Sequence, residues 1–273
     1  MAGRLILVGG GKMGGALLAG WLARGEVTPD RVTVVEPSSE TCDILRERHG
    51  VQPVADADSV AANPMPDAVI LAVKPQLMDQ VAPAYRSFAD RGALILSIAA
   101  GKTVADIERS VGGKAAVVRA MPNTPASIGR GMTVACANRH VDEQQQTLCG
   151  RLLTAVGDMA WLDDETLMDA VTGVSGSGPA YVFWMIECLA DAGVAAGLPR
   201  DLADRLARAT VAGAGELAWR AEESATTLRE NVTSPQGTTA AALEVLMASD
   251  GLAPLMKRAV AAAADRSRAL SGG

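Results

Sequence analysis

The sequence is poor in aromatic residues, histidine and cysteine. Aromatic side chains make up 3% of the 273 residues, whereas 49% of the residues are hydrophobic. Any core must therefore be built mainly from aliphatic side chains. The four cysteines are far apart and form no C-x-x-C pair, which argues against a zinc knot or a disulfide framework. We expect buried, reduced thiols at Cys42, Cys136, Cys149 and Cys188, and no metal site.

Clusters of basic residues and long apolar runs are also missing. The formal net charge is -6, and a surface without a run of Lys or Arg offers little to a phosphate backbone, so we expect no nucleic-acid partner. The longest uncharged stretch, 170–186, contains a glycine-rich loop that a bilayer-spanning helix of about 20 residues would not tolerate. The apolar run Leu5–Val8 is too short for a signal peptide. These features predict a cytoplasmic protein without a membrane partner.

The chain changes character near residue 163. Before it, short β-rich apolar runs alternate with helical patterns, which is typical of βαβ units around a parallel sheet. The expected strands are Leu5–Val8, Val32–Glu36, Ala68–Val73, Ala93–Ile98, Ala116–Ala120 and Thr133–Ala137. The sequence therefore predicts an α/β fold, with a Rossmann-type doubly wound sheet in residues 1–163.

Residues 164–273 contain no strand pattern and predict an all-helical second domain. The expected helices are Ala180–Ala196, Pro199–Glu222, Thr239–Ala248 and Leu252–Leu270. Apolar residues at 182–186 fall on more than one helical face, more than a small helical unit can bury alone. We expect a homodimer through this domain, with Trp184 and Trp219 in the core.

A glycine motif follows the first predicted strand. Residues 9–14 match G-x-G-x-x-G, open an amphipathic helix, and precede a strand that ends in an acid, Glu36, 22 residues beyond Gly14. Gly9 would permit the turn, Gly11 would admit a pyrophosphate, and Gly14 would let the helix pack closely. The expected phosphate-binding residues are Gly9, Gly10, Gly11, Lys12, Met13 and Gly14. The alternative is a strand-to-helix turn without a ligand.

Glu36 bears on the choice between NAD(H) and NADP(H). Its carboxylate could accept the ribose 2′-hydroxyl and would repel a 2′-phosphate, which favours NADH. Ser38, Ser39 and Arg46 follow it and could hold a phosphate if Glu36 turned away. A solvated carboxylate without function is the alternative, so the cofactor choice stays open, with Glu36 and Ser38 as candidate ligands.

Segments at the ends of three predicted strands, together with two stretches of the helical part, make the chain resemble pyrroline-5-carboxylate reductase over essentially its whole length. They are Ala72-Val73-Lys74-Pro75-Gln76, 97–101, 119–126, 172–181 and 231–239. The resemblance implies reduction of Δ1-pyrroline-5-carboxylate to L-proline by NAD(P)H, the last step of proline biosynthesis. It also implies an interlocked homodimer and a possible higher assembly such as a decamer.

The resemblance and the local patterns together indicate site residues. The expected cofactor residues at the strand ends are Ala72, Val73, Lys74, Pro75, Ala99, Ala100, Pro122 and Asn123. The expected substrate residues are Glu222, Asn231, Ser234, Gly237, Thr238 and Thr239. Ser234 and Thr239 would position the substrate carboxylate at a helix N-terminus, with ordinary N-capping by Thr238 as the alternative. Gln236 departs from the family pattern, which has a small residue or Asn there.

Two other functions compete with this interpretation. A β-hydroxyacid dehydrogenase needs a lysine in its helical domain, and no lysine lies between Lys114 and Lys257. A prephenate-type dehydrogenase needs a well-placed histidine, and His49 and His140 lie outside the motifs. A dinucleotide-sensing regulator without turnover is the alternative from another class. The Ser/Thr-rich loop at 233–239 favours a small-ligand pocket instead.

Overall fold

The computed structural model describes residues 3–271, which divide into two compact units. Residues up to Gly176 form the first unit together with residues from Ala263 onward, and Ser177–Ala262 form the second. The C-terminal end of the last helix thus packs with the N-terminal unit. The sequence places the boundary between a dinucleotide-binding domain and a helical domain after residue 163. That division by function stays a prediction.

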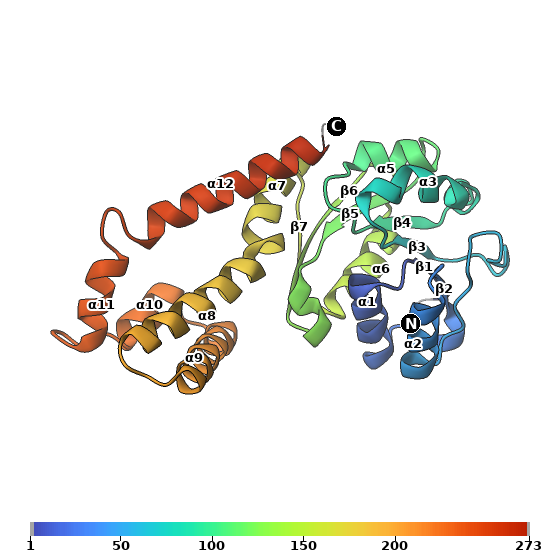
Figure 1. Cartoon of the computed structure of the whole chain (residues 1–273). Coiled ribbons are helices and arrows are strands. Elements are labelled where there is room, and N and C mark those ends of the chain that lie inside the picture. Colours follow the sequence, from blue (N-terminus) through green and yellow to red (C-terminus); the bar gives the residue numbers. More distant parts are fainter. Residues whose placement is uncertain (1–2, 272–273) are drawn as a thin grey trace. The chain divides into compact units, whose positions relative to one another are not determined.

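The first unit is built on a seven-stranded sheet of order β2-β1-β3-β4-β5-β6-β7 (Figure 1). Its strands are β1 Leu5–Val8, β2 Val32–Val35, β3 Ala68–Leu71, β4 Leu94–Ser97, β5 Val117–Met121, β6 Gly131–Ala137 and β7 Gly157–Trp161. The first five are mutually parallel. β2 lies on one side of β1, whereas β3, β4 and β5 follow on the other side, so the order of the strands switches direction at β1. The predicted Rossmann-type sheet with a helical C-terminal domain is confirmed.

Two features of the sheet differ from the sequence prediction. β6 pairs with β5 in the antiparallel direction, so the prediction of a purely parallel sheet was wrong. β7, which pairs with β6, was missed, because its residues Gly-Asp-Met-Ala-Trp include no β-branched side chain. At Gly157 φ is +151° and an added Cβ would lie 2.5 Å from the Gly131 nitrogen, so only glycine lets these two strands begin side by side.

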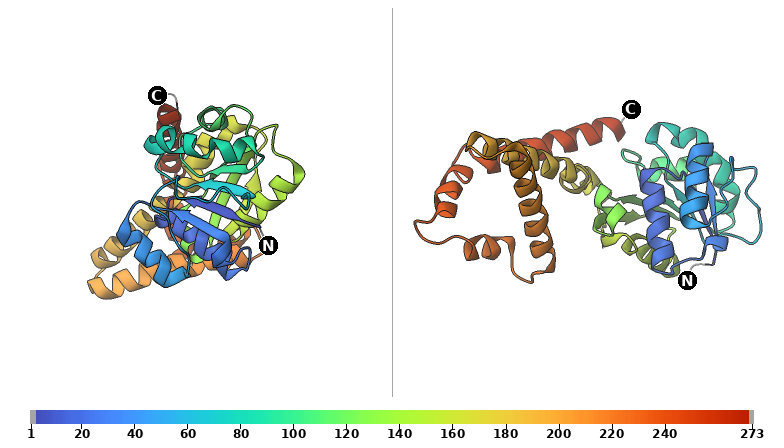
Figure 2. Two further views of the ribbon diagram at one scale, coloured as in Figure 1. Left: turned by 90° about the vertical axis from the view of Figure 1, so that its right-hand side faces the viewer. Right: turned by 60° about the horizontal axis from the view of Figure 1, so that its bottom comes forward.

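Helices cover both faces of the sheet (Figure 2). The helices of this unit are α1 Lys12–Ala23, α2 Ser39–His49, α3 Met78–Val81, α4 Arg86–Asp90, α5 Val104–Val111, α6 Glu143–Thr154 and α7 Met168–Val171. The unit also contains the short helical turns η2 Pro75–Leu77, η4 Thr124–Ile128, η5 Glu165–Leu167 and the π-helical η6 Thr172–Gly176. One core joins α1, α2 and α6 to the sheet, and Trp21 donates its indole N–H to the Leu152 carbonyl at 2.8 Å. A second core joins α3, α4 and α5 to the other face.

The second unit consists of helices only. They are α8 Gly178–Ala195, α9 Arg200–Arg220, α10 Ala225–Asn231, α11 Thr238–Leu246 and the first part of α12 Leu252–Ser271. α10 was missed, because it is short and polar; it begins after Ser224, whose side chain caps the Thr227 amide. None of the helices within the described residues has both the length and the apolar character needed to cross a membrane.

The second unit exposes much of its apolar surface. α8 packs along α9 through the small residues Ala190, Ala203 and Ala207, which bury little area. Trp184 is 63% exposed and Trp219 48% exposed, so neither lies in a core formed by the single chain. Cys188 is also exposed, whereas the other three thiols are buried as expected. Burial raises the pKa of the Cys149 thiol to about 12.

Candidate active site

The glycine turn between β1 and α1 has the geometry of a phosphate-binding loop. Gly9 has φ +96°, and a Cβ there would lie 2.6 Å from the Ala72 carbonyl oxygen. A Cβ on Gly14 would overlap the Gly9 carbonyl oxygen. Any side chain at either position would force the strand and helix apart, which accounts for glycine at both.

The start of α1 fits a pyrophosphate. Gly11 is the N-cap of α1, and no side chain caps the first turn, so the amides of Lys12 and Met13 need a partner from outside the helix. An added Cβ on Gly11 would meet nothing within 4 Å. Open space beside a row of uncapped amides, at the positive end of a helix dipole, suits two phosphate groups.

Glu36 holds the glycine turn in place. Its Oε2 accepts the Gly10 amide at 2.8 Å, and its Oε1 accepts the Ser38 amide at 3.0 Å. A Cβ on Gly10 would lie 2.5 Å from Leu45 Cδ1 of α2. The contact between Glu36 and Gly10 was not foreseen from the sequence, because it joins residues 26 positions apart.

The other predicted cofactor residues follow β3, β4 and β5. Parallel strands end at the same edge of a sheet, so these residues lie along the edge where the glycine turn begins. Lys74 is exposed just before η2, whose first residue is Pro75. Ala99 is buried, and its amide donates to Ser97 Oγ at 3.3 Å. The structure thus brings the predicted cofactor residues to one edge.

Asn123 connects three elements at this edge. Its Nδ2 donates to the carbonyl oxygen and to the hydroxyl of Ser175, both at 3.3 Å. Its Oδ1 accepts the Met132 amide at 2.9 Å. The amide side chain therefore ties the end of β5 to β6 and to η6, and Pro122 beside it is buried. This role is structural and adds to the predicted one beside the cofactor.

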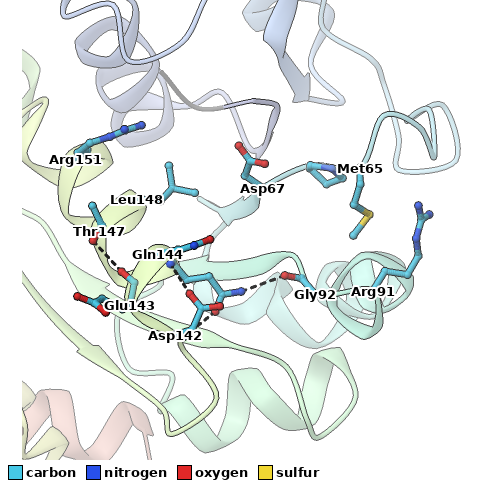
Figure 3. A pocket seen from close by; sticks show the side chains of 12 residues that line it. Met65, Asp67, Arg91, Gly92, Asp142, Glu143, Gln144, Thr147, Leu148 and Arg151 are labelled. Carbon is cyan, nitrogen blue, oxygen red and sulfur yellow. Dashed lines mark hydrogen bonds between the residues drawn. The ribbon is translucent and has the colours of Figure 1, made fainter.

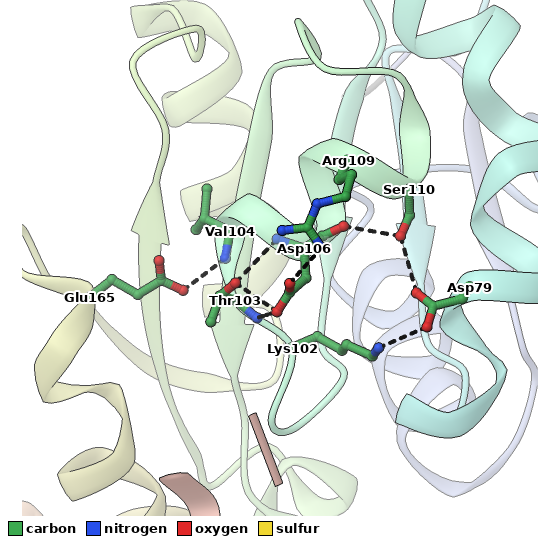
Figure 4. Close-up of polar contacts among 8 residues, drawn as sticks. All are labelled: Asp79, Lys102, Thr103, Val104, Asp106, Arg109, Ser110 and Glu165. Carbon is green, nitrogen blue, oxygen red and sulfur yellow. Dashed lines mark hydrogen bonds and ion pairs between the residues drawn. The ribbon is translucent and has the colours of Figure 1, made fainter. Parts of the chain in front are cut away.

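Behind this edge lies an ion pair that sequence reasoning missed. Arg119 of β5, whose side chain is 5% exposed, pairs with Glu165 at 2.8 Å. The same Glu165 oxygen accepts the Val104 amide at the start of α5, also at 2.8 Å (Figure 4). One carboxylate thus links β5, the loop that carries Ala99 and Ala100, and the segment leading to η6.

The N-terminus of α5 is held by a capping box. Thr103 and Asp106 exchange side-chain and backbone hydrogen bonds, and Lys102 pairs with Asp79 at 3.0 Å (Figure 4). Burial alone would raise the pKa of Asp106, but hydrogen bonds from Thr103 and the charge and hydrogen bond of Arg109 outweigh it and lower the pKa below its usual value. The loop after β4 is therefore fixed at both ends.

All predicted substrate residues lie in the second unit. Glu222 follows α9, Asn231 ends α10, and the remaining four belong to the loop before α11 and its first turn. Gly237 is the N-cap of α11 and Thr238 is the first helical residue, so the alternative of N-capping by the Thr238 side chain was wrong. A Cβ on Gly237 would overlap Ser234 Oγ, which accounts for glycine there. Contact of these residues with a substrate stays a prediction.

Gln236 has a strained backbone. Its φ is +58°, and no other non-glycine residue within the described chain has a positive φ. Asn tolerates this left-handed region better than Gln does, because its short side chain can hydrogen-bond locally. The Asn of the family pattern therefore matches the conformation, and Gln236 tolerates it at a cost in stability.

We expect Gln236→Asn to raise the free energy of unfolding by about 0.5–1 kcal/mol, because it relieves part of the left-handed strain. Urea titration of both proteins measures the change. Gln52→Asn is the matched control, since Gln52 is exposed in a loop and has no positive φ. Equal effects of the two substitutions would show that strain at position 236 contributes nothing.

A cavity of the first unit lies elsewhere. It measures about 760 Å³ and is lined by Asp67 before β3, by Arg91 before β4, and by a stretch that runs from the N-cap of α6 to Arg151 in its last turn (Figure 3). These are the amino ends of the strands, and none of the predicted site residues lines it. Within residues 3–271, no group of three or more His, Cys, Asp or Glu side chains is placed to hold a metal ion.

Comparison with known proteins agrees with this geometry. A family model described as pyrroline-5-carboxylate reductase dimerisation matches residues 165–270. Another, described as NADP oxidoreductase, coenzyme F420-dependent, matches residues 4–101. A pyrroline-5-carboxylate reductase from Synechocystis is 44% identical over 246 residues, which cover 90% of each chain. The chain belongs to the pyrroline-5-carboxylate reductase family. The resemblance stated from the sequence motifs is thereby confirmed.

Solved structures of the family share the whole fold. The pyrroline-5-carboxylate reductase of Coxiella burnetii superposes with a TM-score of 0.92 at 36% identity, covering 99% of each chain. The Plasmodium falciparum enzyme, solved with NADP bound, gives a TM-score of 0.82 at 29% identity, covering 98% of each chain. This family member therefore has both parts of the reductase fold.

Proposed function

We propose that this chain reduces Δ1-pyrroline-5-carboxylate to L-proline with NADH or NADPH, the last step of proline biosynthesis. Membership of the reductase family is the observation that carries the proposal. The glycine turn supports it with open space at Gly11 and an uncapped helix start. The NADP bound to the Plasmodium relative agrees with a nicotinamide cofactor.

For this reaction the protein mainly has to position the nicotinamide against the imine carbon. When bound, the reduced nicotinamide supplies the hydride. A protonated pyrroline carries its positive charge at the ring nitrogen, so the adjacent carbon accepts a hydride without a general acid, and the nitrogen keeps its proton in the amine product. Orientation and exclusion of water then account for most of the rate. The two histidines lie outside the motifs and are not needed for this reaction.

We assign the substrate carboxylate to the start of α11. The N-cap Gly237 offers no side-chain acceptor, so the amides of Thr238 and Thr239 need one, and a carboxylate supplies it at the positive end of the helix. The hydroxyls of Ser234 and Thr239 add donors. Glu222 and Asn231 would lie near the ring nitrogen, where the Glu222 carboxylate favours the protonated imine.

We extend the proposal to assembly and location. The dimerisation model covers the helical part of the chain, and the exposed Phe183, Trp184 and Trp219 offer apolar surface for a second copy. A homodimer through this domain is proposed, and an assembly such as a decamer is compatible with it. We also propose that the protein works in the cytoplasm.

Turnover tests the function directly. Purified protein is incubated with pyrroline-5-carboxylate and either NADH or NADPH, and the loss of reduced-nicotinamide absorbance is followed together with proline formation. Proline formed in proportion to the oxidised cofactor supports the reductase. If neither cofactor supports turnover, the proposal of an enzyme is wrong and a dinucleotide-sensing protein is favoured instead.

Thr239→Ala should lower kcat/KM for the pyrroline by an amount equivalent to about 1.5–3 kcal/mol, the value of a hydrogen bond to a charged group. Binding of the dinucleotide, measured by calorimetry, should stay the same. Thr226→Ala is the control, because Thr226 is exposed on α10 in the same unit. An unchanged kcat/KM in Thr239→Ala would show that the carboxylate lies elsewhere.

A further inference from the structure

The backbone of Glu36 is fixed on both sides. Its amide donates to the Val54 carbonyl at 2.9 Å, and its own carbonyl accepts the Cys42 thiol at 3.2 Å. Val54 in turn donates its amide to Val34 of β2 at 2.8 Å. The residue therefore cannot move away from the end of β2 without breaking bonds to the sheet and to α2.

The carboxylate is held as firmly as the backbone. Each oxygen accepts one backbone amide, Gly10 at 2.8 Å and Ser38 at 3.0 Å. An ionised carboxylate has about four lone-pair sites, so about two remain free. These free sites are acceptors beside the glycine turn, which suits the two hydroxyls of an adenosine ribose. Neither of the two amides remains free to donate to a phosphate.

Two of the neighbours that could hold a 2′-phosphate, Ser38 and Arg46, already have partners of their own. Ser38 Oγ accepts two hydrogen bonds from Thr41, one from its amide at 3.3 Å and one from its hydroxyl at 3.2 Å. The Ser38 side chain therefore caps α2. Arg46 pairs with Asp43 at 2.7 Å. Glu40 adds a further acid in the first turn of α2. Among residues 3–271, Glu36 forms no ion pair with a Lys or Arg, whereas Arg46 of α2 pairs with Asp43.

We propose that Glu36 makes this protein selective for NADH by holding a negative charge where NADPH carries its 2′-phosphate. The inference rests on the proposed function, since it concerns the same cofactor. It separates this chain from the Plasmodium relative, which was solved with NADP bound. A carboxylate held by two backbone amides cannot turn away when the phosphate arrives, so the repulsion persists.

Binding measured without substrate tests the proposal independently of turnover. Calorimetric titration of the wild-type protein should give an affinity for NADH at least about 30-fold higher than for NADPH, since like charges in contact are strongly disfavoured. Glu36→Gln keeps the side-chain length and one amide acceptor but removes the charge. It should bring the two affinities to within about threefold of each other. The kcat/KM ratio for the two cofactors should change in the same direction.

Two further variants separate charge from structure. Glu36→Asp keeps the charge and should keep the preference for NADH. Glu47→Gln removes an equal charge from the exposed far end of α2 and should leave the affinity ratio unchanged. Thermal melting of each variant shows whether the fold is kept, and Glu36→Asp covers the case in which Glu36→Gln unfolds.

The outcomes distinguish this inference from the proposed function. Wild-type protein that binds NADPH as tightly as NADH would overturn the inference, and so would an unchanged ratio in folded Glu36→Gln or a lost preference in folded Glu36→Asp. Selective NADH binding without any reduction of pyrroline-5-carboxylate would uphold the role of Glu36 and overturn the proposed function.

Discussion

Gly11→Ala is expected to keep the wild-type stability and to lose more than about 100-fold in dinucleotide affinity. A Cβ at Gly11 meets nothing within 4 Å, and φ there is -64°, so the fold accepts alanine. The methyl group enters the space proposed for the pyrophosphate. It would remove two or more charge-assisted hydrogen bonds worth about 1.5–3 kcal/mol each. Calorimetry measures the affinity, and urea titration measures the free energy of unfolding.

Two other glycine substitutions serve as comparisons for Gly11→Ala. Gly14→Ala places a Cβ on the Gly9 carbonyl oxygen, so it should lower both the stability and the affinity. Gly150→Ala lies on α6 in open space and should lower neither. If Gly11→Ala binds the dinucleotide as well as Gly150→Ala does, the pyrophosphate lies elsewhere and the proposed cofactor site is wrong.

Glu165→Ala is expected to lower the free energy of unfolding by about 3–5 kcal/mol, the usual result of leaving a buried charge without its partner. Arg119 would keep its charge with 5% of its side chain exposed, and its Nη2 already has no partner among the described residues. The Val104 amide would lose its acceptor as well. We therefore also expect the KM for the dinucleotide to rise, because the loop with Ala99 and Ala100 precedes α5.

Two controls test whether the burial of Arg119 causes the loss of stability in Glu165→Ala. Asp43→Ala breaks an exposed pair of similar length, 2.7 Å, and should cost less than about 1 kcal/mol. The double variant Arg119→Met with Glu165→Leu should recover most of the stability lost in Glu165→Ala, because no unpaired charge remains. A loss in Glu165→Ala no larger than in Asp43→Ala would show that the pair at the buried Arg119 contributes little.

The strands of the sheet differed in how well the sequence predicted them. β1 was predicted with its observed bounds, because four apolar residues buried on both faces give an unbroken run. β7 was missed because its burial alternates and its side chains have weak strand preference. The reversal of β6 was not foreseen either. Strand direction depends on how the connecting segment runs in space, and the connection through η4 is short enough to return antiparallel.

The candidate site shows the same division. The roles of the glycines at 9, 11 and 14 could be predicted from their spacing, because each glycine is required by the local geometry of the turn or of the helix start. The contact between Glu36 and Gly10 joins residues 26 positions apart, and the pair Arg119–Glu165 joins residues 46 apart. Neither pair leaves a periodic pattern in the sequence, so neither could be predicted.

By itself the sequence determined the fold class, the family and the edge of the sheet where a dinucleotide is expected. These depend on short-range patterns: apolar periodicity, glycine spacing and motifs at strand ends. Only the tertiary structure decided that the carboxylate of Glu36 is held by two amides, that Glu165 neutralises a buried arginine, and that the end of α12 packs with the first unit. These features depend on contacts between distant residues, which packing brings together and local pattern does not encode.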